Sequence, residues 1–154
     1  MQGQGFSLAR ARREHRAVVV LFLSTLCPYS NSYNDLIRGM AIDFARKDVL
    51  FVGVHSDRLE TKEEIRAHAR KHEHTFPMIP DDDTAVARLL GAKRTPEAFV
   101  LDGEGKLRYR GRIAAKIGTP DLRNALDALL AGRKIEPVET KAFGCAIRWT
   151  RTKA

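Results

Sequence analysis

Two runs of consecutive apolar residues dominate the first third of the chain. Residues 17–23 read Ala-Val-Val-Val-Leu-Phe-Leu and residues 49–54 read Val-Leu-Phe-Val-Gly-Val. Unbroken β-branched and aliphatic runs are typical of strands buried on both faces. Between the runs, apolar residues recur at helical spacing at Tyr33, Leu36, Ile37, Met40, Ala41 and Phe44. The pattern predicts a strand, a helix and a second strand, with the two strands parallel and adjacent.

Two further helices are predicted in the middle of the chain. A capping box at Thr61 and Glu64 opens the first helix, which runs to about His72. The second covers residues 84–90 and is followed by Gly91, a residue that accepts the left-handed backbone common after helix ends.

A hairpin, a last helix and a tail complete the pattern. Residues 97–102 and 106–113 flank a Gly-Glu-Gly turn, which predicts two antiparallel strands. An apolar stripe over residues 122–130 predicts a helix, and residues 133–154 show no clear period. We expect a single domain over residues 1–132, followed by a C-terminal tail.

Composition excludes several classes of protein. A chain of 154 residues with 44% hydrophobic and 30% charged residues suits one soluble globular domain. No segment approaches the ~20 apolar residues of a membrane helix. The first residues lack the apolar stretch of a signal peptide, so we expect a cytoplasmic protein as written, or an extracytoplasmic one if a leader has been removed.

The net charge of +8 raises the question of a nucleic-acid partner. Cations concentrate in residues 10–16 and 148–153. No nucleic-acid motif accompanies them, so we interpret both as solvated surface and expect no nucleic-acid partner. His68, His72 and His74 lack a cysteine or carboxylate at a convincing partner spacing, so we expect neither a metal site nor a cofactor.

Cys27 is the strongest candidate for chemistry. It stands between the first buried strand and the helix that follows. Unpaired backbone N–H groups and the positive end of the helix dipole favour a thiolate at such a position. In an open α/β sheet, the carboxyl ends of the parallel strands also form the functional edge. The alternative is a cysteine packed as a small apolar residue.

The order of the elements and two motifs resemble the thioredoxin-like superfamily. The segment Cys27-Pro-Tyr-Ser30 is similar to the Cys-x-x-Cys of its oxidoreductases, with Ser30 in place of the second cysteine. Thr95-Pro96 matches the cis-proline that the superfamily carries beside its reactive cysteine. Over roughly residues 17–149 the chain resembles redoxin-type domains of the TlpA and AhpC/TSA kind. The resemblance implies an α/β fold with a central mixed sheet and helices on both faces.

The resemblance also implies roles for residues around Cys27. Thr95 and Pro96 would bind substrate, with the backbone of Thr95 pairing with an extended chain. Pro28 and Ser30 would support Cys27, and Ser30 would donate a hydrogen bond to the sulfur. A serine cannot resolve a mixed disulfide.

Cys145, His55 and Glu97 are further candidates. If the tail folds back, Cys145 would resolve an adduct on Cys27; the alternative is a free, packed thiol. His55 follows the second strand and would donate a proton to a leaving thiol, unless it faces water. Glu97, next to Pro96, would shuttle a proton, unless it is an exposed edge-strand carboxylate.

We therefore expect a thiol-disulfide oxidoreductase with antioxidant activity that acts on protein or small-molecule thiols and disulfides. A peroxiredoxin-like thiol peroxidase is the first alternative. It is favoured by Ser24, three residues before Cys27, but Val20 and Pro96 occupy positions where that family has proline and arginine. A non-catalytic binding module is the second alternative. The oligomeric state stays open.

Overall fold

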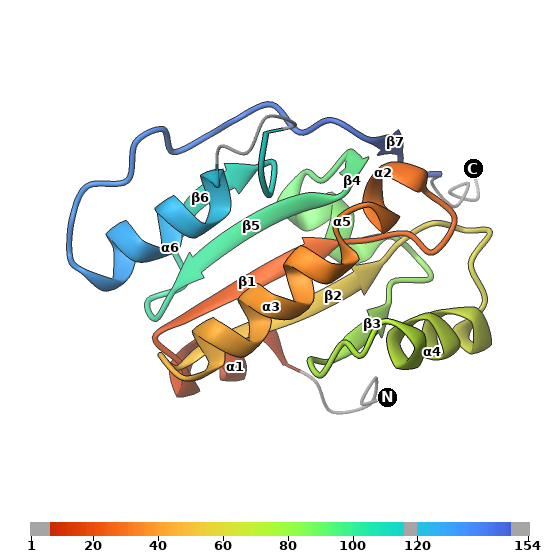
Figure 1. Cartoon of the computed structure of the whole chain (residues 1–154), viewed down its shortest axis with the longest axis horizontal. Helices are drawn as coiled ribbons and strands as arrows, with labels where there is room; N and C mark the ends of the chain where they lie inside the picture. Colours follow the sequence, from red (N-terminus) through yellow and green to blue (C-terminus); the bar gives the residue numbers. More distant parts are fainter. Residues whose placement is uncertain (1–6, 116–119, 149–154) are drawn as a thin grey trace.

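The computed structural model describes residues 7–115 and 120–148. A five-stranded sheet in the order β3-β2-β1-β5-β6 forms its centre (Figure 1). The strands are β1 (Ala17–Phe22), β2 (Val49–His55), β3 (Met78–Pro80), β5 (Glu97–Asp102) and β6 (Leu107–Gly111). β1, β2 and β3 are parallel, whereas β5 is antiparallel to both β1 and β6. The sheet is therefore mixed, as predicted.

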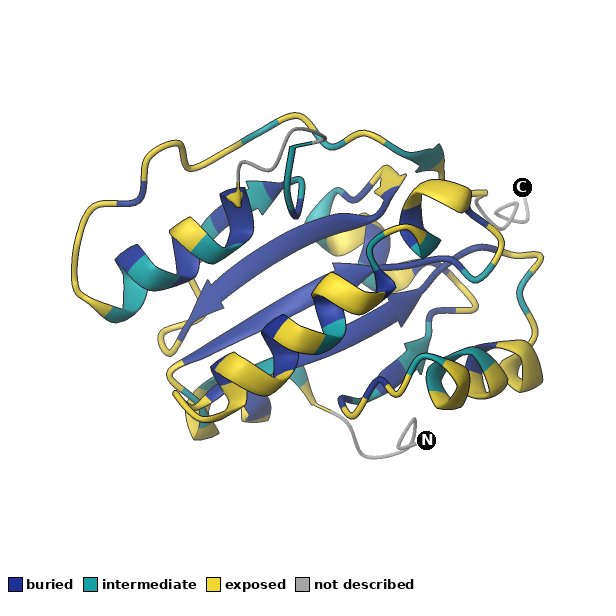
Figure 2. Cartoon of the chain, viewed as in Figure 1, coloured by how far each residue is buried: buried dark blue, intermediate teal, exposed yellow. Residues whose placement is uncertain are grey.

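Helices cover both faces of this sheet. They are α1 (Leu8–Glu14), α2 (Pro28–Asn31), α3 (Asn34–Ala45), α4 (Lys62–Lys71), α5 (Ala85–Leu90) and α6 (Asp121–Leu130). Successive side chains of a strand point to opposite faces, so β1 contributes to two cores. Val19 packs in the core that includes residues of α3 and α6, and Val20 in the core that includes residues of α1 and α5. Figure 2 shows the central strands largely buried between these layers.

The structure contains two elements of the main fold that the apolar pattern does not predict. α1 buries only Ala11, so its sequence shows no apolar stripe. β3 is three residues long and pairs with β2 through Gly53 and Met78. Both depend on contacts with distant parts of the chain rather than on a local period.

The C-terminal tail folds back across the molecule. The N–H of Arg110 donates to Val138, and the N–H of Thr140 donates to Arg110, so the tail first follows β6. It then forms β7 (Cys145–Ala146), which pairs antiparallel with β4 (Arg94–Thr95). Figure 1 shows this blue segment passing from the end of α6 to β7 beside α2. The tail therefore reaches the carboxyl ends of β1 and β2.

Within the described part of the chain, every helix is too short or too polar to serve as a membrane span.

Candidate active site

Cys27 lies at the junction that the sequence predicts. It is the N-cap of α2, with an extended backbone, and its carbonyl accepts a hydrogen bond of 2.9 Å from the N–H of Asn31. Pro28 occupies the first helical position, where a missing N–H costs nothing. The Cys27 residue is only 3% exposed. The thiol therefore sits at a helix start but beneath the protein surface.

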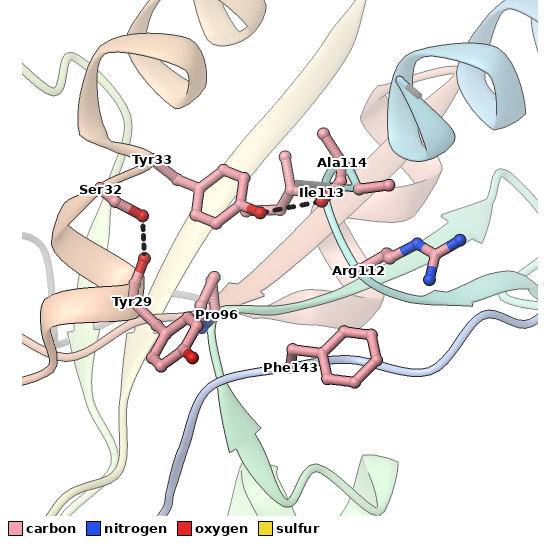
Figure 3. Close-up of a pocket in the computed structure, with 9 residues that line it drawn as sticks. Tyr29, Ser32, Tyr33, Pro96, Arg112, Ile113, Ala114 and Phe143 are labelled. Atoms are coloured by element: carbon pink, nitrogen blue, oxygen red, sulfur yellow. Dashed lines mark hydrogen bonds between the residues drawn. The ribbon is translucent and has the colours of Figure 1, made fainter. Parts of the chain in front are cut away.

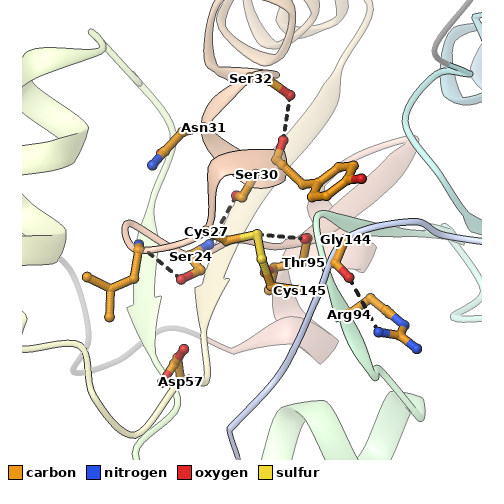
Figure 4. Close-up of a disulfide and its surroundings, with 12 residues drawn as sticks. Ser24, Cys27, Ser30, Asn31, Ser32, Asp57, Arg94, Thr95, Gly144 and Cys145 are labelled. Carbon is orange, nitrogen blue, oxygen red and sulfur yellow. Dashed lines mark hydrogen bonds between the residues drawn. A yellow bond between two sulfur atoms is a disulfide. The ribbon is translucent and has the colours of Figure 1, made fainter.

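A disulfide joins Cys27 to Cys145, 118 residues further along the chain (Figure 4). Their Cα atoms are 6.0 Å apart, within the usual range for a disulfide. The pairing of β7 with β4 places Cys145 directly opposite Thr95. The tail thus supplies the second cysteine that the segment Cys27-Pro-Tyr-Ser30 lacks.

Thr95 and Pro96 lie beside this disulfide. The carbonyl oxygen of Thr95 is 3.4 Å from Cys27 Sγ, and the Thr95–Pro96 peptide bond is cis. A disulfide sulfur carries no hydrogen, so the 3.4 Å approach becomes a hydrogen bond only when Cys27 is a thiol. We expected the backbone of Thr95 to be open to a substrate chain, but β7 already pairs with it.

Gly144 allows the tail to approach β4 closely. A Cβ atom at this position would collide with the carbonyl group of Thr95. The carbonyl oxygen of Gly144 accepts a hydrogen bond of 3.4 Å from Arg94 Nη1 (Figure 4). The tail therefore needs a residue without a side chain just before Cys145.

Beyond β7, several contacts anchor residues 147 and 148, among them a backbone hydrogen bond of 3.1 Å from the N–H of Arg58 to the carbonyl of Arg148. Arg148 binds the Asp57 carboxylate through both Nε and Nη2, with a shortest distance of 2.7 Å. The Asp57 side chain is only 4% exposed, so water has little access to the carboxylate of this ion pair. Ile147 is buried, and its N–H donates to the carbonyl of Lys93 at 3.0 Å. Asp57 follows β2, so the tail is fixed to the same edge that carries Cys27.

Ser30 and Ser24 shape the loop between β1 and α2. Ser30 Oγ accepts a hydrogen bond of 3.1 Å from the N–H of Ser24, and Ser24 Oγ accepts one of 3.1 Å from the N–H of Leu26. Both hydroxyls are buried with their residues. The predicted donation from Ser30 to the sulfur stays a prediction.

His55 forms a buried pair with Glu60 below that loop. His55 Nδ1 is 3.0 Å from Glu60 Oε2, and neither side chain is more than 1% exposed. The same Glu60 oxygen accepts a hydrogen bond of 2.8 Å from the N–H of Thr25. His55 Nε2 and Glu60 Oε1 have no hydrogen-bond partner among the described residues. His55 therefore does not face water, and Glu60 is a site residue that the sequence did not reveal.

Glu97 is also buried rather than exposed. β5 lies between β1 and β6, so Glu97 is on an inner strand and not on an edge strand. Its carboxylate accepts hydrogen bonds from the N–H groups of Lys93 at 2.8 Å and Arg94 at 3.2 Å. Glu97 therefore holds the segment that forms β4.

An apolar pocket of about 330 Å³ opens beside α2 and the tail (Figure 3). Its walls include Tyr29, Tyr33, Pro96, Ile113 and Phe143. The Tyr33 hydroxyl donates a hydrogen bond of 2.8 Å to the carbonyl of Ala114 (Figure 3). The pocket offers a place for an apolar group beside Pro96, although neither cysteine is among its lining residues.

His68 of α4 contacts α2, and His74, which follows α4, contacts the carbonyl of Asn34 in α3. His68 Nε2 is 2.8 Å from Asn31 Oδ1, and Asn31 Nδ2 donates to the carbonyl of Thr25 at 2.9 Å. Burial lowers the pKa of His68 to about 4, and nearby imidazoles including His72 lower it as well. Among the residues that the structure describes, no three histidine, cysteine or acidic side chains are placed to hold a metal ion.

Solved structures with this fold include two that match nearly the whole chain. A hypothetical protein from Sinorhizobium meliloti 1021 is 29% identical, with a TM-score of 0.87 over 96% of this chain and 86% of that protein. An uncharacterized conserved protein from Geobacillus kaustophilus is 26% identical, with a TM-score of 0.87 over 95% of this chain and 83% of that protein. The two matches cover 96% and 95% of this chain, so each of them includes part of the C-terminal tail.

A thiol:disulfide interchange protein from a Bacteroides species shares the fold at 20% identity, with a TM-score of 0.66 over 84% of this chain and 81% of that protein. Among curated proteins, none matches this chain. The sequence matches the AhpC/TSA family over residues 1–110, a stretch that contains Cys27 and Thr95-Pro96 and stops before Cys145. That match covers most of the chain, and the mixed sheet and its thioredoxin-like neighbours agree with it: the chain is a thioredoxin-like redoxin domain and belongs to the AhpC/TSA family.

Proposed function

We propose that the protein is a thiol-disulfide oxidoreductase that cycles between the Cys27–Cys145 disulfide and the corresponding dithiol. The observation that carries this proposal is the disulfide itself, which joins the cysteine at a helix start to a cysteine held against β4. Its substrates would be protein or small-molecule thiols and disulfides. The family and the fold support this general chemistry.

The two sulfurs are sufficient for a balanced reaction. Two external thiols reduce the protein disulfide to a dithiol and leave as one external disulfide, and the reverse reaction oxidises the protein. Each direction transfers two electrons. Cys145 provides the second sulfur that a cysteine at position 30 would otherwise provide, because Ser30 cannot form a disulfide.

The surrounding residues would position the reacting groups. Pro28 and Ser30 fix the loop that presents Cys27. Glu97 holds the segment before β4, and with it Thr95. The buried His55 imidazole and its Glu60 partner lie under the same loop and would supply or accept a proton as Cys27 changes between thiol and thiolate.

Thiol peroxidase activity, with the antioxidant role that it would provide, is a second candidate function because the chain belongs to the AhpC/TSA family. Peroxide reduction needs a cation or other donor to stabilise the departing oxygen. Within the described parts of the chain, the hydrogen-bonding contact of Cys27 Sγ is with the carbonyl oxygen of Thr95, which is an acceptor. This contact favours disulfide exchange over peroxide reduction.

The test compares the protein with its Cys27→Ser and Cys145→Ser variants on two substrates. With a mixed disulfide of glutathione and a peptide, we expect turnover by the unsubstituted protein and loss of turnover in both variants. Hydrogen peroxide should oxidise the reduced protein no faster than an ordinary thiol. Fast oxidation by peroxide together with sluggish disulfide exchange would reverse the ranking of the two functions. Full turnover by Cys145→Ser would contradict the two-cysteine cycle.

A further inference from the structure

We infer that Cys145, and not Cys27, is the cysteine that meets the external thiol or disulfide. This inference rests on the proposed function and specifies its order of steps. It departs from the expectation drawn from the sequence, in which Cys27 attacks the substrate first.

The two halves of the disulfide differ in exposure. Cys27 is 3% exposed, whereas Cys145 is partly exposed and is followed by the exposed Ala146. In thiol-disulfide exchange the attacking thiolate must reach the sulfur that it attacks, so the rate depends on access to that atom. The exposure of the two residues therefore favours attack on Cys145.

The tail also closes the route to Cys27 along β4. β7 occupies the backbone of Arg94 and Thr95, so an incoming extended chain cannot pair with them. Gly144 lies so close to the carbonyl of Thr95 that not even a methyl group fits between them. A substrate would have to displace β7 before it met Cys27 from this side.

Contacts on both sides of β7 oppose such a displacement. On one side, Arg148 binds Asp57 with two hydrogen bonds to Oδ2, at 2.9 and 2.7 Å. On the other side, Thr140 Oγ1 accepts a hydrogen bond of 3.0 Å from the N–H of Arg112 and is 2.7 Å from the hydroxyl of Tyr109. Cys145 is thus held in place by its flanking segments and presents its sulfur from a fixed strand.

Reduction of the protein then follows one order. An external thiolate attacks Cys145 Sγ, the internal S–S bond breaks, and its electron pair leaves on Cys27 as a thiolate at the start of α2. A second external thiolate attacks the external sulfur of the mixed disulfide and departs with it as a disulfide. The Cys145 thiolate remains. The two protons released by the external thiols balance those taken up by the two protein thiolates.

The oxidising direction retraces the same steps. The Cys145 thiolate attacks an external disulfide, releases one external thiolate and carries the other half as a mixed disulfide. The Cys27 thiolate then attacks Cys145 Sγ, closes the internal disulfide and releases the second external thiolate. Cys27 is the buried closing thiol in this scheme, and Cys145 is the nucleophile toward substrate.

The order of attack can be read by trapping the first adduct. Oxidised protein is mixed with glutathione, quenched within its first turnover with N-ethylmaleimide, and mapped by peptide mass spectrometry. We expect glutathione on Cys145 and maleimide on Cys27 in excess of the opposite arrangement by roughly tenfold or more, since Cys145 is partly exposed and Cys27 is only 3% exposed. Glutathione mainly on Cys27 would overturn the inference and leave the proposed function intact. No adduct and no reduction would overturn both.

Two variants test whether the anchored tail is the barrier. Arg148→Ala removes an anchor of the tail, and we expect the share of adducts on Cys27 to rise several-fold. Arg123→Ala removes the exposed pair with Asp43, away from the disulfide, and should leave the distribution unchanged. An unchanged distribution in Arg148→Ala would overturn the role of the tail as the barrier.

Discussion

Gly144 shows how strongly the site depends on one position. Its backbone contacts the carbonyl group of Thr95, where a Cβ atom would collide with backbone atoms that cannot move freely. We predict that Gly144→Ala lowers the free energy of unfolding of the oxidised protein by about 1–3 kcal/mol, the usual cost of inserting a methyl group into a packed contact. Urea unfolding under oxidising conditions measures this change.

Gly39 provides a matched control for that substitution. It is exposed on α3, and a Cβ atom there would meet no atom of the rest of the described structure within 4 Å. Gly39→Ala should stabilise the protein by about 0.5–1 kcal/mol, because alanine loses less backbone freedom in a helix. Equal unfolding midpoints for Gly144→Ala and the unsubstituted protein would show that the tail does not need this close approach.

At the residue scale, local motifs could be predicted and distant partners could not. Cys27 and Thr95-Pro96 stand out because a few neighbouring residues define each motif. Glu60 accepts a hydrogen bond from the N–H of Thr25, which is 35 residues away in the sequence. Asp57 and Arg148 are 91 residues apart. No local spacing reveals such pairs, since only the fold brings their atoms together.

At the element scale, we expect the contact between α4 and α2 to depend on pH. Burial and nearby imidazoles lower the pKa of His68 from 6.5 to about 4 in the folded protein. The groups that face it are His55, His72, His74 and the Glu60 carboxylate, and only the carboxylate opposes the shift. His68 Nδ1 is buried and has no partner in residues 7–115 and 120–148, so its protonation would create a buried N–H that these residues leave unpaired.

The sign of the effect follows from proton binding. As the pH falls from 6.5 toward 4, the unfolded chain binds a proton at His68 and the folded protein does not, so folding loses stability over that window. We predict that the melting temperature falls over this range and that His68→Gln makes the fall shallower. Thermal unfolding between pH 7.5 and 4.5 measures both slopes.

His15→Gln, at a histidine that pairs with Asp48 away from α4, is the control. Parallel slopes for His68→Gln and the unsubstituted protein would contradict this account.

The elements with a clear pattern of apolar residues were predicted from the sequence. Strands that form only because they pair with a distant segment were not. β1, β2, α3 and the β5–β6 hairpin follow from apolar patterns and turn residues. β7 consists of two residues, and nothing in their side chains marks a strand. It exists because the tail reaches β4, and the path of a tail without a period cannot be read from sequence.

At the scale of the whole molecule, the tail completes the candidate active site by supplying Cys145. The family match ends at residue 110, before the tail, yet the tail supplies one of the two sulfurs and covers the other. Its contacts extend from β6 through β4 to the residues after β2. The oxidised site therefore combines Cys27, from the segment after β1, with Cys145 from the C-terminal tail.

The central claim is that Cys27 and Cys145 form one reversible redox pair, and a redox titration tests it most directly. The protein is equilibrated in glutathione buffers of varied ratio, alkylated, digested and analysed for the peptide that links the two cysteines. The account predicts one two-electron transition from free thiols to the Cys27–Cys145 linked peptide, with glutathione adducts only as minor species. Two free thiols or two glutathione adducts at the oxidising end, without the linked peptide, would contradict it.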